Sequence, residues 1–155
     1  MKIAISAVAL FCEDIREERS GAITLIGIVG DNVVVPHRPK PESVGILPRL
    51  GIYVRVNFDA TQQIEPPELT VRFPDGETLS SKKLTDEDVK EACSTAKLGN
   101  PIAGLIFRIQ AGNIPIKKLG RLTAEVTIGN ETYLAGFLNL IDEMPTSPTA
   151  SEQPS

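Results

Sequence analysis

The sequence has few of the residues that catalytic and metal sites require. It contains one His, two Cys, no Trp, five Phe and two Tyr in 155 residues. One His and two distant Cys do not supply the ligands of a zinc site. His37 stands in a Pro-rich segment, where a solvated loop residue is expected rather than a general base. The segment GIVGDN lacks the spacing of a phosphate-binding glycine loop. We therefore expect no catalytic activity, no metal and no cofactor.

Long apolar runs and a strong excess of one charge are also missing. No run approaches the roughly 20 apolar residues that span a bilayer, and the net charge is −4. Lys117, Lys118 and Arg121 form only a small basic group without an aromatic platform. We expect no membrane partner and no nucleic-acid partner. Cys12 and Cys93 are too few for a disulfide framework, so free thiols in a reducing cytoplasm are expected.

The first segment, Met1 to Cys12, allows two interpretations. Lys2 followed by an apolar run and a cysteine resembles an export or lipid-attachment signal. However, the charged region is a single lysine, and Phe11 occupies the position where signal peptidases need a small residue. Residues 3–11 are apolar on both alternating faces, which is typical of a strand covered on both sides. We therefore predict a core strand rather than a leader.

Alternation of apolar and polar residues dominates the rest of the chain. In Leu50–Phe58, the residues Leu50, Ile52, Val54, Val56 and Phe58 point one way, a period of two that a helix cannot bury on one stripe. Similar patterns predict a hairpin over Glu68–Leu84 and a second one over Leu122–Leu140, turning at Gly129-Asn130. Further strands are predicted at Ala22–Val29, which we expect to pair with the first strand, at Val33–Val35 and at Ile102–Gln110. Loops are predicted at Cys12–Gly21, His37–Pro48 and Ala111–Leu119.

One helix is predicted after Thr85, which serves as its N-cap before three acidic residues. Cys93 is expected to be half buried on its apolar face, and Leu98–Pro101 is expected to end it. Eight or nine short strands with one helix predict an antiparallel two-sheet sandwich, immunoglobulin-like or C2-like, with a closed barrel as the alternative. One domain is predicted over residues 1–141, with a disordered polar tail over 142–155.

The densest charged cluster lies in CEDIREE, after the first predicted strand. The acidic residues could belong to a calcium-binding sandwich loop, namely Glu13, Asp14, Glu17 and Glu18. However, the interleaved Arg16 and Arg19 favour a salt-bridged loop, and the ligand pattern of a calcium site is missing. Solvated charge is the default interpretation of such a cluster.

The segments ALFCEDIREE, GAITLIGI and GDN, followed by LGIYVRV, resemble an uncharacterised bacterial family of small all-β proteins. The resemblance covers Met1 to about Leu140. It implies a bacterial or phage-related, cytoplasmic, non-enzymatic β-domain in which CEDIREE is a family feature. Glu13, Asp14, Arg16 and Glu17 are then the candidate partner-binding residues.

A β-rich chain without a catalytic constellation leads us to expect a protein-interaction or structural module with a protein partner. A homo-oligomer is also compatible with the sequence. The alternative function is a small-ligand or carbohydrate-binding domain, against which the low aromatic content counts, because sugar sites use aromatic faces.

Overall fold

Most strands of this chain are built from apolar residues that alternate with polar ones along the sequence. The computed structural model describes residues 3–37, 42–96 and 101–143. These residues contain ten strands and one helix: β1 (Ser6–Cys12), β2 (Asp14–Glu17), β3 (Ile23–Ile26), β4 (Asn32–Val35), β5 (Gly45–Asp59), β6 (Glu68–Arg72), β7 (Thr78–Lys83), α1 (Asp86–Ala96), β8 (Ile102–Ile116), β9 (Gly120–Ile128) and β10 (Glu131–Asp142).

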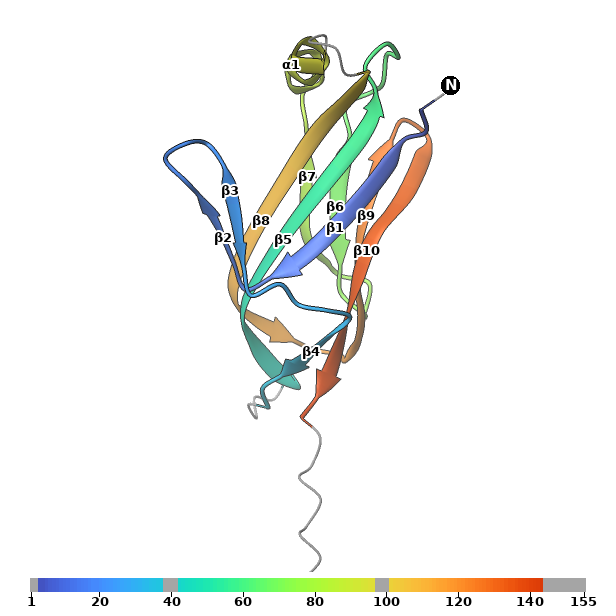
Figure 1. Cartoon of the computed structure of the whole chain (residues 1–155). Helices are drawn as coiled ribbons and strands as arrows, with labels where there is room; N and C mark the ends of the chain where they lie inside the picture. Colours follow the sequence, from blue (N-terminus) through green and yellow to red (C-terminus); the bar gives the residue numbers. More distant parts are fainter. Residues whose placement is uncertain (1–2, 38–41, 97–100, 144–155) are drawn as a thin grey trace, which may run out of the picture.

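The strands form two sheets that pack face to face, and a hairpin that stands outside them (Figure 1). One sheet has the order β1-β5-β8 and the other β4-β10-β9-β6-β7, while β2 and β3 pair only with each other. The predicted β-sandwich is confirmed. The alternative of a closed barrel is wrong, because β7 and β8 each have one hydrogen-bonded neighbour among the described strands.

The core lies between the two sheets, as the period of two predicts. Ile52, Val54, Val56 and Phe58 of β5 are fully buried, and so are the inward residues of β9 that face them, Leu122, Ala124 and Val126. Long β5 lies between β1 and β8, and every second side chain from Leu50 to Phe58 is directed into the core.

Several local predictions are confirmed. β6 and β7 form the predicted hairpin, and β9 and β10 form the other, with Gly129 at φ 60° in its turn. Thr85 caps α1: its hydroxyl accepts the Asp88 amide at 3.2 Å, and Asp88 accepts the Thr85 amide at 2.8 Å. Cys93 is half buried, as expected. Most of the predicted helix stop, residues 98–100, lies outside the described residues.

The prediction of a loop over Cys12–Gly21 is wrong, because this segment contains β2. The predicted pairing of Ala22–Val29 with the first strand is also wrong. β3 pairs with β2, and a single bridge from Phe11 to Val29 remains on β1. A short turn joins β2 to β3, so their pairing closes a smaller loop and costs less chain entropy than pairing β3 with β1.

Two further predicted loops are partly strand. β5 begins at Gly45 and β8 ends at Ile116, so Pro48 and Pro115 both lie inside strands. Pro48 lies before Gly51, where the pairing of β5 with β1 ends, and β8 is an edge strand. At such positions the missing proline N–H leaves no ladder hydrogen bond unmade.

The predicted covering of the first strand on both faces is also wrong. Phe11 is buried in the core, but Val8 and Leu10 on the other face are exposed. At the other end of the chain, strand β10 includes Asp142, which was predicted to begin the tail. The remainder of the predicted tail, residues 144–155, lies outside the described residues.

Candidate functional site

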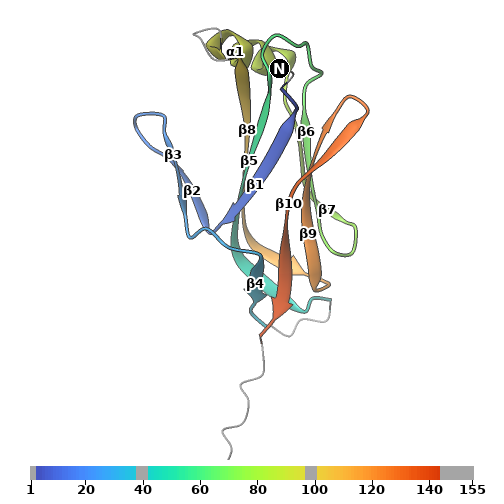
Figure 2. The same cartoon turned by 45° about the vertical axis from the view of Figure 1, so that its right-hand side comes forward.

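The four candidate residues of CEDIREE lie at or in the β2–β3 hairpin. Glu13 immediately precedes β2, which contains Asp14, Arg16 and Glu17. The hairpin starts where β1 ends and projects away from the three-stranded sheet (Figures 1 and 2). Its base touches β5 and β8, so the structure brings the candidates together on one protruding element.

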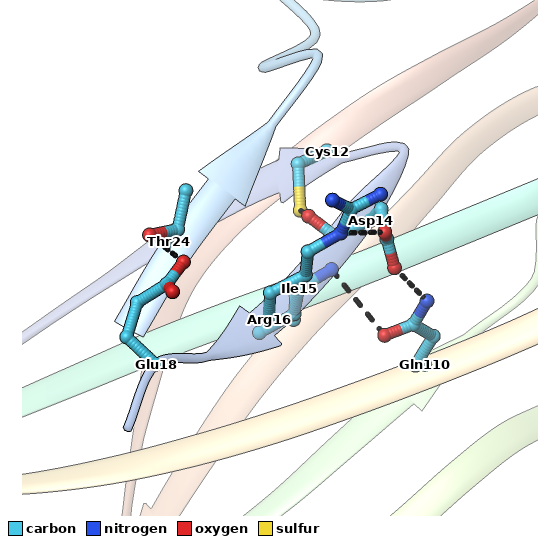
Figure 3. Close-up of polar contacts among 7 residues, drawn as sticks. All are labelled: Cys12, Asp14, Ile15, Arg16, Glu18, Thr24 and Gln110. Atoms are coloured by element: carbon cyan, nitrogen blue, oxygen red, sulfur yellow. Dashed lines mark hydrogen bonds and ion pairs between the residues drawn. The ribbon is translucent and has the colours of Figure 1, made fainter. Parts of the chain in front are cut away.

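Asp14 connects the hairpin to β8. Its carboxylate accepts hydrogen bonds from the Gln110 side-chain amide and from Arg16 Nε, the latter at 2.9 Å (Figure 3). The Ile15 amide donates to Gln110 Oε1 at 3.3 Å, so one glutamine side chain holds two neighbouring hairpin residues. The hydrogen bond from Gln110, followed by that from Arg16, lowers the pKa of Asp14 below its usual value.

Glu17 and Glu13 also make contacts inside the molecule. Glu17 forms an ion pair with Arg108 of β8 at 3.1 Å, with both side chains exposed. The Glu13 amide donates to the carbonyl of Ile26 at 3.0 Å, and its side chain lies against Gly27, where a Cβ would be 2.9 Å away. All four candidates therefore have a visible structural role in shaping or fastening the hairpin. Their predicted role in partner binding stays a prediction.

Cys12 lies buried under the hairpin base. Its Sγ lies 3.5 Å from the Asp14 carbonyl oxygen, to which it donates, and burial raises the pKa of the thiol. Gly51 of β5 lies opposite Cys12 in the ladder. A Cβ on Gly51 would lie 2.7 Å from Cys12 Sγ and 2.9 Å from Ile15 Cγ1. Glycine is therefore what allows the hairpin base to approach the sheet so closely.

The outer face of the three-stranded sheet exposes an apolar cluster beside the hairpin. Val8, Leu10 and Ile106 are 54%, 40% and 39% exposed. One row across β1, β5 and β8 consists of Val8, Arg55 and Ile106. The next row on the same face, two residues along each strand, consists of Leu10, Tyr53 and Arg108. We call Val8, Leu10, Ile106, Tyr53 and Arg55 the outer-face patch.

Arg55 occupies the centre of a row whose other two members are aliphatic. Its Nε donates to Asn57 Oδ1 at 3.0 Å. The guanidinium lies over Gly104 of β8, where a Cβ would come within 3.0 Å of Nη2. Among the ion pairs of the described residues there is none to Arg55. The patch thus presents a cation between apolar side chains.

The outer face of the five-stranded sheet has a different character. The outward residues of β9 are Arg121, Thr123, Glu125 and Thr127, none of which is apolar. Leu134 is 57% exposed but stands opposite Glu125 in the ladder. Arg121 lies 4.1 Å from the ring centre of Phe137, so this cation already has an aromatic partner.

Two surface hollows lie in the described part of the chain, and the first adjoins the outer-face patch, with which it shares Arg55 and Ile106. One of about 480 Å³ lies between α1 and β8 and includes Arg55, Leu84, Thr95 and Ile106. The other, of about 380 Å³, lies between the β6–β7 turn and the end of β8, where Lys117 and Glu77 form an ion pair at 3.0 Å. Neither contains His37.

Within the described ranges, no group of His, Cys, Asp and Glu side chains is placed to hold a metal ion. The helix found there lacks the length and apolar character needed to cross a membrane. Comparison of the chain with protein-family models, curated proteins and solved structures gives no match.

The outer-face patch was missed by reasoning from the sequence. Both faces of residues 3–11 are apolar, which was taken to mean that both are covered. The signal that points to the open face is in the neighbouring strand, where Tyr53, Arg55 and Asn57 alternate with the core residues. A strand that pairs with such a polar face exposes its own outward residues on the same side.

Proposed function

We propose that this chain is a protein-interaction module without catalytic activity that binds its partner on the outer-face patch. The observation that carries the proposal is the exposed cluster of Val8, Leu10 and Ile106 on one sheet face. Contiguous exposed apolar side chains with a polar rim mark interaction sites more often than isolated ones do. Tyr and Arg, which border this cluster, are enriched among the residues that dominate binding energy.

The strand order supports the immunoglobulin-like form of the sandwich, a scaffold that commonly presents binding surfaces. If β5 and β8 are strands B and E, and β6, β9 and β10 are C, F and G, each set falls in the sheet that this layout requires. Helix α1 then takes the place of strand D, and β2–β3 is an insertion after strand A. The insertion stands beside the patch, where its Glu17 pairs with Arg108, the ladder partner of Tyr53.

The proposal is tested by cross-linking in the native host, followed by capture and mass spectrometry. The variant is Leu10→Asp, and the matched control is Leu134→Asp, which places the same charge on the opposite sheet face. Leu10→Asp is expected to lose the cross-linked partner, and Leu134→Asp to retain it. Equal capture by both variants, with both folded by circular dichroism, would refute a binding role for the patch.

Small-ligand binding is the second candidate function, and the hollow beside α1 favours it. Its volume of about 480 Å³ lies in the range of ligand pockets, roughly 300–1,000 Å³. It contains no aromatic residue, which argues against a carbohydrate. A thermal shift with a panel of small polar compounds, removed by Thr95→Phe, would support this candidate. No shift with any compound would count against it.

A further inference from the structure

We propose that the partner segment is an acidic amphipathic α-helix that lies along the strands, with a carboxylate on Arg55 and its apolar stripe on Val8, Leu10 and Ile106. The inference rests on the proposed function and names the chemistry of the partner.

The first argument concerns the hydrogen-bond donors of Arg55 that have no partner side chain among the described residues. Any partner that covers Val8 and Ile106 also covers Arg55, which lies between them in the same row. Removing a guanidinium from water is costly unless a charge and hydrogen bonds replace the water. The contact with Asn57 uses only Nε. The remaining donors therefore select a partner that brings a carboxylate, which a guanidinium binds with two parallel hydrogen bonds.

The second argument is the size of the face. Neighbouring strands lie about 4.8 Å apart, so Val8 and Ile106 are separated by roughly 10 Å across β5. That spacing is close to the diameter of one α-helix, about 10–12 Å. Along β1, Val8 and Leu10 are two residues apart, which is about 6.8 Å. The rise from position i to i+4 of a helix is about 6 Å, so successive apolar positions match this spacing.

The third argument is charge, and it distinguishes this partner from a second copy of the chain. Arg55 is the one charged residue of the outer-face patch. Arg108 beside it is paired with Glu17, and Asp59, which β5 presents on the same face, accepts hydrogen bonds from Thr61. In a two-fold dimer the same surface meets itself, so the patch of the second copy would bring another Arg55 and no carboxylate of its own. Like charges across an interface oppose association, whereas Asp or Glu on a helix complements them.

The test is selection from a phage-displayed library of helices against the full-length protein. Each helix carries Leu at i+3 and i+4, which lie on the two sides of one helix face, and the central positions i and i+7 are randomised. We expect enrichment of Asp or Glu at one of the central positions, because Arg55 lies between Val8 and Ile106. A synthetic peptide of the enriched sequence should bind Arg55→Gln about 10- to 100-fold more weakly than wild type, the range for a hydrogen bond to a charged group. Arg55→Glu should recover binding when the peptide carries Lys in place of that acid.

The matched control is Arg121→Gln, which removes an arginine from the opposite sheet face and should leave peptide affinity unchanged. Each variant is first shown to have the wild-type urea midpoint. Selected helices without an acidic bias, or affinities that do not change in Arg55→Gln, would overturn the inference. If Leu10→Asp still abolishes capture of the cellular partner, the proposed function survives that result. Sedimentation that shows a dimer disrupted by Leu10→Asp would instead assign the patch to a second copy.

Discussion

Replacing Gly51 by Ala tests how the hairpin is fastened to the sheet. The added methyl carbon would lie 2.7 Å from Cys12 Sγ and 2.9 Å from Ile15 Cγ1. Unstrained carbon contacts are at roughly 3.5–4.0 Å, so the hairpin base must move away. Overpacking a well-filled site costs about 1–3 kcal/mol. Alanine gains about 0.5–1 kcal/mol over glycine in a strand interior, so we expect a net loss of about 1–2 kcal/mol in the free energy of unfolding.

The matched control is Gly112→Ala in neighbouring β8. There the nearest neighbour of a new Cβ is the Pro48 carbonyl oxygen at 3.4 Å, an ordinary contact. We expect this variant to be as stable as wild type or slightly more stable. Urea titration followed by circular dichroism gives both values, and an unchanged slope would show that the denatured state is unaltered.

A double variant identifies the cause of the loss. If the clash with Sγ is responsible, Cys12→Ala should cost less stability in the Gly51→Ala background than in the wild-type background. The close packing of the hairpin base would be refuted if Gly51→Ala unfolded at the wild-type midpoint or above it. Additive effects of the two substitutions would likewise show that Sγ and the new methyl group do not compete for space.

Three further predictions concern single groups. The pKa of Asp14 is lowered on folding. Its contribution to the free energy of unfolding is therefore complete above the ordinary aspartate pKa of about 3.9, and it is lost as the pH falls through the lower pKa of the folded protein. The protection factor of the Ile15 amide, which compares its exchange rate with that of an unstructured chain at the same pH, should then fall, and Asp14→Asn should abolish that fall. Iodoacetamide should modify half-buried Cys93 before buried Cys12. Equal rates of modification would contradict the burial of Cys12 under the base of the hairpin. Thr85→Ala should cost about 1 kcal/mol, and an unchanged urea midpoint would show that the cap contributes nothing.

The sandwich could be predicted from the sequence because its core strands are regular. In β5 every second residue from Leu50 to Phe58 is buried, and this period of two specifies a half-buried strand and excludes a helix. The cap at Thr85 and the turn at Gly129 are local signals, and both were read correctly. What failed was pairing. Which strand neighbours which depends on chain reversals such as the short turn from β2 to β3, and alternation carries no information about that choice.

The candidate site was predicted only in part. The charged residues of CEDIREE were located correctly at the surface, but Asp14 and Glu17 find partners in Gln110 and Arg108, more than 90 positions away. Contacts at that separation exist only once β8 lies beside β5. The outer-face patch likewise depends on three strands that are distant in sequence, so neither its extent nor the central position of Arg55 can be read from any one of them.

The placement of β1 and β10 in different sheets, with β1 paired to β5, has a mechanical consequence. β1 starts at one end of the sandwich and β10 finishes at the other (Figure 1). Tension between Ser6 and Asp142 would therefore pull β1 along its own axis against β5, with which all seven of its residues are in register. The ladder bonds would share the load instead of opening one after another. Stretched between its two ends, this chain should resist force as a shear clamp, with β1 as the element that breaks first.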